Sequence, residues 1–307
     1  MTETSATPHV SYVFDGGFAL PTMVSVFSLL QHRPKDVEVQ FFVTEDVPKM
    51  RATVEKLQAL FPGAEIKTTV MTLPDTLSRD FIGYPVAGFA RLLLPDYLDK
   101  RTIYLDGDTW VRDDIGELYD QNLDGRVLGA CLDAAFLKLL WRSKRNPKLK
   151  HRRLVEMRAV DAIAPSEGYF NAGMMVVDIP ALREQGLIED FTNITRATTF
   201  WSDNGLLYHD QSYLNTVFGA HTKRLDPQWN AIWANRSASH KAIPAELRAK
   251  FAASQADPAI LHMTSKPKPW IKPVLRGGRF VWGQKYRKVL AEFRERVGAD
   301  AWAQLST

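Results

Sequence analysis

Residues 101–108 read RTIYLDGD, and this stretch decides how the rest of the chain is interpreted. Its first five residues are rich in apolar and β-branched side chains, which predicts a buried strand over residues 101–105. Asp106 and Asp108 follow directly, and ligands of open α/β sheets bind at the carboxyl ends of strands. We expect both carboxylates to point to the same side of an extended chain, and Gly107 to let a ligand approach the backbone. Such a pair suits Mg²⁺ or Mn²⁺, although Asp-x-Asp is also common in solvent-exposed turns.

The residues before this stretch alternate between strand and helix patterns. Residues 10–14, VSYVF, predict a strand that ends in a turn at Asp15-Gly16-Gly17. The spacing of apolar residues predicts helices over 18–30, 47–61 and 88–99, and further strands over 37–44 and 64–70. This alternation is typical of βαβ units, so we expect an α/β fold with a mostly parallel central sheet flanked by helices.

The residues after it continue in the same way. We expect strands over 126–132, 169–178 and 259–261, and helices over 181–196 and 210–218. The last strand is followed by His262, which by itself is more typical of a structural histidine. Together with the two carboxylates it becomes a candidate third metal ligand, and a histidine among oxygen ligands favours Mn²⁺ over Mg²⁺. Lysines at 266 and 268 would neutralise a departing diphosphate, or would belong to a basic, proline-rich loop.

Composition limits the classes of protein that remain. The chain has 307 residues, 45% of them hydrophobic and 24% charged, which excludes wholesale disorder. A formal net charge of +4 is too small to indicate nucleic-acid binding. Cys131 is the single cysteine, so an intramolecular disulfide is excluded and a reducing compartment is expected. Because residues 1–8 lack the features of a secretory signal, and no apolar run reaches the roughly 18 residues that a membrane span needs, we expect a soluble, cytoplasmic protein.

The chain carries seven motifs in order: VFDGGFA (13–19), FARLLLPDYL (89–98), RTIYLDGDTWVRDDIGELYD (101–120), LGACLD (128–133), YFNAGMMVVD (169–178), DQSYLN (210–215) and HMTSKPKPW (262–270). In this order they resemble the motifs of glycosyltransferase family 8, which includes bacterial lipooligosaccharide galactosyltransferases and glycogenin. The resemblance implies a GT-A fold over residues 1–273, followed by a basic, amphipathic C-terminal tail over 274–307. It also implies metal-dependent transfer of a hexose, with retention, from a UDP-sugar to a glycan or lipid-linked acceptor, as in lipopolysaccharide or polysaccharide synthesis.

The resemblance also implies roles for individual residues. A metal, Mn²⁺ or Mg²⁺, would be held by Asp106, Asp108 and His262. The nucleotide-sugar donor would be contacted by Asp15 at the base, Arg91 at the phosphate or sugar, and Lys268 at the β-phosphate.

Four further residues are implied around the sugar. Asp133 and Asn171 would line the sugar and acceptor region, and Asp210 and Gln211 would lie beneath the anomeric carbon as the catalytic pair. Each also has a structural interpretation, because buried polar side chains often satisfy backbone groups and an aspartate before a helix is often its N-cap. Since a neutral amide is a poor nucleophile, we favour same-face attack guided by the leaving phosphate, with Gln211 and Asp210 as electrostatic support.

Two departures from the family pattern bear on the donor. Gly16-Gly17-Phe18 replaces polar residues and a tyrosine, so contacts to the base would differ and UDP is less secure than the diphosphate. Ser265 replaces a glycine, so the phosphate-binding loop would lie differently.

Two other functions compete with this interpretation. Phosphatases that form an aspartyl-phosphate also use Asp-x-Asp, but they favour Thr or Val where Trp110 stands, and about a hundred residues precede the motif here. A binding module without turnover would keep the fold and the nucleotide affinity alone.

Two basic segments remain. Residues 138–153 hold eight Lys or Arg and no acid, which is typical of a solvated loop or of a surface that attracts an anionic acceptor or membrane. In the tail, apolar residues recur at helical spacing from Trp282 to Val297, which predicts a helix that either lies on an anionic membrane at the inner face of the cell or packs onto the domain.

Overall fold

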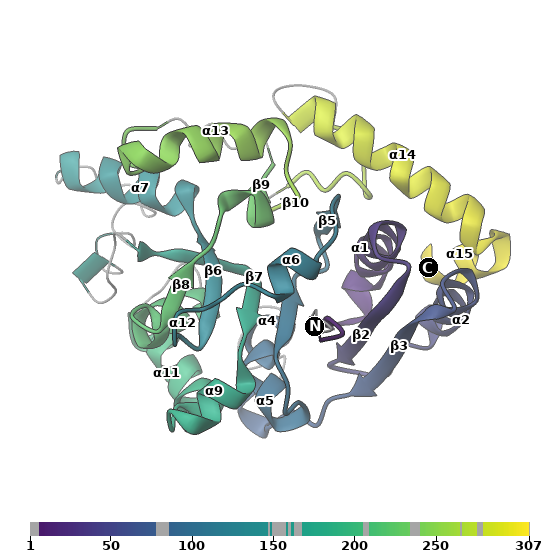
Figure 1. The fold of residues 1–307 in the computed structure, drawn as a ribbon, viewed down its shortest axis with the longest axis horizontal. Helices are drawn as coiled ribbons and strands as arrows, with labels where there is room; N and C mark the ends of the chain where they lie inside the picture. Colours follow the sequence, from purple (N-terminus) through teal and green to yellow (C-terminus); the bar gives the residue numbers. More distant parts are fainter. Residues whose placement is uncertain are drawn as a thin grey trace, which may run out of the picture.

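A computed structural model of the chain describes residues 6–77, 86–146, 148, 158, 161–162, 168–204, 209–233, 240–264, 266–274 and 279–306. Its first half follows the predicted alternation (Figure 1). β1 (His9–Phe14), α1 (Ala19–His32), β2 (Lys35–Val43), α2 (Arg51–Leu60) and β3 (Gly63–Val70) succeed one another. β1 pairs with β2, and β2 with β3, in parallel. Every residue of β1 is buried, as a strand covered on both faces must be.

The main sheet has seven strands in the order β3-β2-β1-β4-β7-β6-β8. Its second half comprises β4 (Thr102–Leu105), β6 (Leu128–Leu132), β7 (Phe170–Val177) and β8 (Thr222–Arg224). β7 runs antiparallel to both β4 and β6, whereas the other pairings are parallel. The mostly parallel α/β sheet is therefore confirmed, with one reversed strand that the sequence pattern did not reveal.

A second, smaller sheet has the order β5-β10-β9, with β5 (Thr109–Val111), β9 (Ala231–Ile232) and β10 (Ile260–His262). β10 pairs antiparallel with β5, so that His262 lies opposite Thr109. This pairing brings a histidine from near the end of the chain beside Asp108. β5 and β9 are short, and the sequence analysis did not predict them.

The helices differ from the prediction in two places. The segment predicted as one helix over 88–99 consists of α4 (Val86–Ala90), the 3-10 turn Arg91–Leu93 and α5 (Leu94–Tyr97). The single helix predicted over 181–196 is wrong, because the structure has α9 (Ile179–Glu184), α10 (Ile188–Thr192) and α11 (Ile194–Asn204). Gly186 adopts a φ of 68°, a left-handed conformation that ends a helix, and the Asn193 side chain accepts a hydrogen bond from the Arg196 amide where α11 starts.

The other described helices and 3-10 turns lie before residue 279. They are α6 (Gly116–Tyr119), α7 (Ala134–Arg145), α12 (His209–Phe218), α13 (Arg248–Ala256), and 3-10 turns at Gly16–Phe18, Pro48–Met50, Asp75–Leu77, Pro227–Asn230 and Ala245–Leu247. α7 shows that the first half of the basic segment 138–153 is helical and not a loop. Most residues of its second half, and Ser265, lie outside the described residues.

The C-terminal segment forms α14 (Arg279–Val297) and α15 (Ala299–Ser306), which lie along α1 and α2 (Figure 1). Trp282, Tyr286, Phe293 and Val297 are buried in the same core as α1. The rings of Phe293 and Phe27 lie 5.5 Å apart. Of the two interpretations of the apolar stripe, the structure therefore shows packing onto the domain. Among the described residues, no helix has both the length and the apolar character needed to cross a membrane.

Candidate functional site

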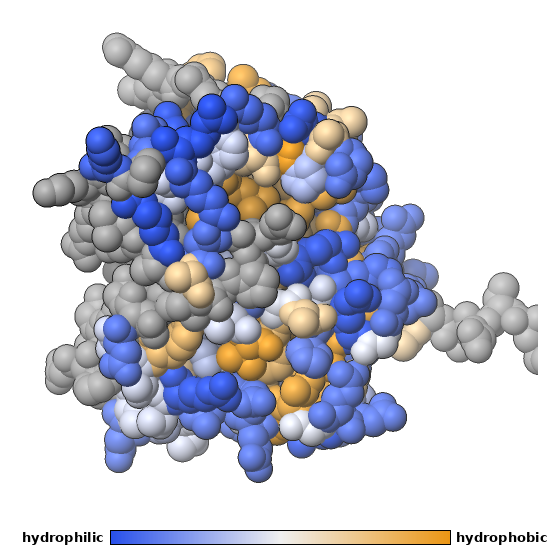
Figure 2. All heavy atoms as spheres, turned by 90° about the vertical axis from the view of Figure 1, so that its left-hand side faces the viewer, coloured by the Kyte–Doolittle hydropathy of each residue, from blue (hydrophilic) through white to orange (hydrophobic). Residues whose placement is uncertain are grey.

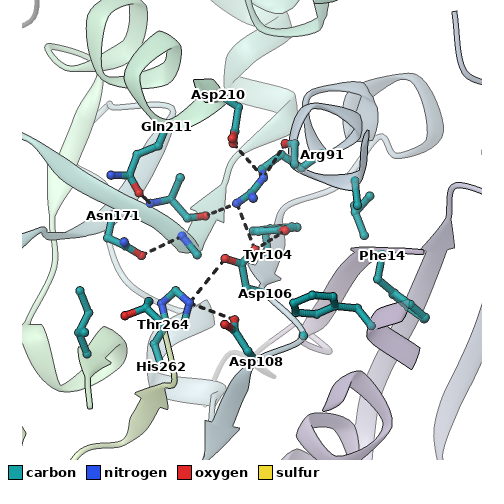
Figure 3. A pocket seen from close by; sticks show the side chains of 18 of the residues that line it. Phe14, Arg91, Tyr104, Asp106, Asp108, Asn171, Asp210, Gln211, His262 and Thr264 are labelled. Atoms are coloured by element: carbon teal, nitrogen blue, oxygen red, sulfur yellow. Dashed lines mark hydrogen bonds and ion pairs between the residues drawn. The ribbon is translucent and has the colours of Figure 1, made fainter. Parts of the chain in front are cut away.

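A cavity of about 420 Å³ opens at the carboxyl ends of β1 and β4. All ten residues that the sequence analysis singled out line it: Asp15, Arg91, Asp106, Asp108, Asp133, Asn171, Asp210, Gln211, His262 and Lys268. They come from segments up to 253 positions apart, from Asp15 to Lys268. Figure 3 shows most of them pointing toward a common space.

Asp106, Asp108 and His262 form the acidic end of the cavity. One ligand atom from each lies within 4.8 Å of the others. The His262 Nε2 atom is 3.1 Å from Asp108 Oδ1 and 3.6 Å from Asp106 Oδ2. The sequence analysis expected the two carboxylates to point to one side of an extended chain, but the chain is not extended here. They flank a tight turn, in which the Thr109 amide and hydroxyl both donate to the Asp106 carbonyl.

Two glycines make room for this arrangement. A β-carbon at Gly107 would collide with the Thr22 side chain of α1. Gly107 therefore lets the turn pack on α1, and it also lines the cavity, where the sequence analysis expected a ligand to approach the backbone. A β-carbon at Gly173 on β7 would collide with the His262 ring and the Asp106 carboxylate. Gly173 is thus required for these two side chains to meet.

The charged groups at this end shift one another's pKa values. Burial by itself would raise the pKa of Asp108, but His262 and Lys268 outweigh burial and lower it. Burial likewise would lower the pKa of His262, but Asp108 and then Asp106 raise it. The Lys268 ammonium donates to Asp108 Oδ2 at 2.5 Å and to the Met263 carbonyl at 2.8 Å. The His262 ring and the Lys268 ammonium therefore both stabilise the ionised form of Asp108.

Arg91 joins the acidic end to the opposite wall. Its guanidinium lies 3.2 Å from Asp106 Oδ1 and 3.1 Å from Asp210 Oδ2, and it also donates to the Gly88 and Ala172 carbonyls. Burial raises the pKa of Asp210 to about 6, with Arg91 opposing and Asp106 adding to the effect. Arg91 is therefore a buried ion-pair partner of both carboxylates.

Amide side chains form a second network at the other wall. Asp133 caps α7 by accepting the Phe136 amide, and its other oxygen accepts from Asn171 Nδ2 at 3.2 Å and Gln211 Nε2 at 3.3 Å. The Gln211 carbonyl oxygen accepts the Ala172 amide. These side chains satisfy buried polar groups, as the structural interpretation expected, and they also line the cavity.

Two other predicted features lie at the rim and on α12. Asp15 accepts the Gly17 amide and so caps the turn after β1, while Phe18 and Trp270 meet edge to face with ring centroids 6.4 Å apart. α12 begins at His209, so Asp210 lies in its first turn and is not its N-cap.

Sequence reasoning missed two residues that hold the site. The Tyr104 hydroxyl donates to Asp106 Oδ1 at 2.6 Å, and burial raises its pKa well above the usual value, so it remains a donor. Alternation along the strand RTIYL places Tyr104 and Asp106 on one face and was a usable signal. Asn230 contacts both His262 and Asn171. It lies in a 3-10 turn, where no periodicity marks it.

The residues at the acidic end fit a divalent cation. Of the described residues that line the cavity, five are aspartates, whereas Arg91 and Lys268 are the permanent cations. A cation bound between Asp106, Asp108 and His262 would offset this excess. Two carboxylate oxygens and an imidazole nitrogen suit Mn²⁺, and with less preference Mg²⁺.

Comparisons with known proteins agree with this geometry. Residues 9–272 match the family model described as "Glycosyl transferase family 8". The chain is 29% identical over 190 residues to General stress protein A of Bacillus subtilis (strain 168), spanning 60% of this chain and 59% of that protein. It is 28% identical over 284 residues to Probable galacturonosyltransferase-like 5 of Arabidopsis thaliana, spanning 86% of this chain and 71% of that protein.

Solved structures show the same fold. The galactosyltransferase LgtC, in complex with donor and acceptor sugar analogs, superposes with a TM-score of 0.68 at 20% identity, over 97% of this chain and 99% of that one. The bifunctional glycosyltransferase WbbM superposes with a TM-score of 0.71 at 18% identity, over 100% of this chain and 53% of that one. The architecture is therefore the GT-A fold. Because the family match extends over most of the chain, this protein belongs to glycosyltransferase family 8.

Proposed function

We propose that this glycosyltransferase moves a hexose from a UDP-sugar to an acceptor hydroxyl, with retention and with Mn²⁺. The observation that carries the proposal is the convergence of Asp106, Asp108 and His262 at one end of a 420 Å³ cavity. The similarity to LgtC, solved with donor and acceptor sugar analogs, and to the galacturonosyltransferase-like proteins of Arabidopsis supports a sugar nucleotide as donor and a glycan as acceptor.

The acidic end would hold the donor's diphosphate. A divalent cation bound there would neutralise charge on the leaving diphosphate. Lys268, whose ammonium contacts Asp108 at this end of the cavity, would bind the β-phosphate and stabilise its developing charge. Asp15, beside Phe18 and Trp270, would face the base.

The opposite wall would hold the transferred sugar. Asp133 and Asn171 would contact the sugar and acceptor hydroxyls, while Gln211 and Asp210 would lie beneath the anomeric carbon. Gln211 Oε1 accepts the Ala172 amide, which makes an already weak amide nucleophile weaker. This supports same-face attack, with Asp210 and Gln211 stabilising positive charge that develops on the sugar. Isolation of a glycosyl adduct on either residue would contradict this mechanism.

A donor screen tests the proposal. Purified protein is incubated with UDP-, GDP- and ADP-hexoses, with Mn²⁺ and with EDTA, and free nucleoside diphosphate is measured. We expect release from a UDP-hexose with Mn²⁺ and little release with EDTA. Metal-dependent nucleotide binding without release would instead indicate a binding module, and hydrolysis of p-nitrophenyl phosphate would indicate a phosphatase.

A basic cluster supports an anionic acceptor. Burial lowers the pKa of His240, and four cations around it lower that pKa further: Lys138, Lys241, Arg142 and Arg248. Trp141 is contacted by the cationic groups of Arg145 and Lys241, each 4.7 Å from a ring centroid. In Figure 2, hydrophilic side chains gather along the upper part of this face, and apolar side chains are visible below them.

The basic cluster is also close to the cavity. α7 begins beside Asp133, and a rise of about 1.5 Å per residue puts residues 138–145 on the order of 7–18 Å further along. An acceptor whose phosphate or carboxylate lies on the order of 7–18 Å from its reactive hydroxyl would reach both.

Charge reversal tests this class of acceptor. We expect Arg142→Glu with Lys241→Glu to raise the KM for a phosphorylated or uronic acid-containing acceptor about tenfold, with kcat and the KM for a neutral acceptor unchanged. The matched control is Arg287→Glu with Lys288→Glu on the exposed face of α14. Equal effects of the two double variants would contradict the assignment.

Peripheral membrane binding is a further part of the proposal. Ile271, Phe280 and Val281 are 74%, 41% and 56% exposed, and lysines at 266, 272 and 285 lie near them in sequence. Apolar side chains beside cations favour an anionic bilayer. We expect sedimentation with anionic liposomes, and weaker sedimentation of Phe280→Ser with Val281→Ser. If the protein did not bind anionic liposomes even at low salt, peripheral membrane binding would be contradicted.

A further inference from the structure

Asn230 connects the candidate metal ligands to the amide network, yet it does not line the cavity. It ends the 3-10 turn Pro227–Asn230 and is 5% exposed. Its Oδ1 atom lies 3.0 Å from His262 Nδ1, and its Nδ2 atom lies 2.9 Å from Asn171 Oδ1. One side chain therefore touches a candidate metal ligand and a candidate sugar-binding residue.

The orientation of these amides follows from one backbone group. The Gly173 amide donates to the Asn171 side chain at 3.0 Å, and since a backbone N–H can only donate, the receiving atom must be the oxygen of Asn171. The group of Asn230 that faces this same oxygen must then be its NH₂. The carbonyl oxygen of Asn230 must then face His262, so the hydrogen bonds fix which way the Asn230 amide points.

This orientation decides the state of the His262 ring. A carbonyl oxygen only accepts, so Nδ1 of His262 must carry a hydrogen. The neutral ring then has its lone pair on Nε2, the nitrogen that faces Asp108 and Asp106. That lone pair is what a divalent cation needs from an imidazole, and partners of this kind are known to orient metal-binding histidines.

We propose that Asn230 is a positioning residue that accepts the Nδ1 hydrogen of His262 and so presents Nε2 to a divalent cation. The inference rests on the metal site of the proposed function. It adds a chain of three side-chain and backbone contacts, from Gly173 through Asn171 and Asn230 to His262. Asn171 also donates to Asp133, which accepts from Gln211 as well. The candidate metal ligands and the candidate sugar-binding residues would therefore be ordered together.

Two substitutions separate positioning from a merely structural role. Asn230→Ala removes both the acceptor for Nδ1 and the donor to Asn171. Asn230→Asp keeps an acceptor for Nδ1 but cannot donate to Asn171. The matched control is Asn215→Ala, because Asn215 is a buried asparagine whose amide bonds the backbone of Phe170 and Gln211 and does not contact the metal ligands.

The first measurement is the affinity for Mn²⁺ in the absence of donor and acceptor. Free Mn²⁺ is quantified by its electron paramagnetic resonance signal. We expect Asn230→Ala to bind about 10- to 100-fold more weakly, and Asn230→Asp and Asn215→Ala to bind at least nearly as well as the wild type. Thermal melting of each variant is recorded alongside, and we expect Asn230→Asp and Asn215→Ala to melt earlier although they keep their Mn²⁺ affinity.

The carboxylate added in Asn230→Asp can itself attract Mn²⁺, so the second measurement is made without metal. Metal-free protein labelled with [¹⁵N]histidine is examined by NMR, with His262 assigned by its loss in His262→Gln. We expect a slowly exchanging Nδ1 hydrogen in the wild type and Asn230→Asp, and its loss in Asn230→Ala.

Three results would contradict a positioning role for Asn230. Wild-type Mn²⁺ affinity in Asn230→Ala, equal loss in Asn230→Asp, or absence of the Nδ1 hydrogen in the wild type would each overturn the inference. If the wild type binds Mn²⁺ but releases no nucleotide, the proposed function fails and this inference survives. If the wild type binds no divalent cation, both fail.

Discussion

Asp210 offers a test of the electrostatics of the site that needs no substrate. The residue is 3% exposed, and its pKa is raised from 3.8 to about 6, chiefly by burial and further by Asp106, with Arg91 opposing. We predict that Asp210→Asn stabilises the protein near neutral pH. Asparagine has the shape of the protonated acid but never ionises, so it avoids placing a charge in this wall.

The sign and size follow from proton linkage. The unfolded chain loses the proton near pH 3.8 and the folded chain near pH 6. Stability from this group is therefore fully present below about pH 4 and is lost as the pH rises through about 6. A shift of about two pH units corresponds to about 3 kcal/mol. Asp210→Asn and the wild type should thus be equally stable near pH 4, and the variant should be more stable by about 3 kcal/mol near pH 7.5.

Urea unfolding followed by tryptophan fluorescence, repeated across this pH range, measures the difference. Asp257→Asn is the control for loss of one carboxylate, since the Asp257 side chain is 87% exposed and a surface pair contributes about 0–1 kcal/mol. A difference between Asp210→Asn and the wild type that does not change with pH, or a variant less stable near neutral pH, would refute the reasoning.

Three further predictions concern residues around the same cavity. Arg91→Met should lower the free energy of unfolding by about 3–5 kcal/mol, because it leaves two carboxylates without their buried partner; a change below about 1 kcal/mol would contradict this. Gly173→Ala should weaken Mn²⁺ binding more than tenfold, about 1.4 kcal/mol, because the methyl group collides with the His262 ring, while circular dichroism stays unchanged; isothermal titration calorimetry measures it, and unchanged affinity would show that the ring can move. Cys131 should not react with a thiol reagent in the folded protein but should react in urea, because burial raises the pKa of its thiol; fast labelling of the native protein would contradict the buried position.

Much of the fold could be predicted because its signals are local. The break at Asp15-Gly16-Gly17 and the apolar strand before Asp106 each depend on a few neighbouring residues, and the structure confirms both. The helix over 181–196 failed because the left-handed turn at Gly186 overrides the apolar spacing. The tail could not be assigned from its pattern, since an apolar stripe is the same whether it meets a membrane or the rings beside α1.

The candidate site divides in the same way. Ordered motifs identified ten residues, and all of them line one cavity, but their contacts were outside the reach of sequence. The sequence by itself determined which side chains are present and that strands would end in carboxylates, because those depend on short-range propensity. Only the tertiary structure decided that β10 pairs with β5, that Gly173 makes room for His262 and that Asn230 faces its ring, because these depend on packing between segments far apart in the chain.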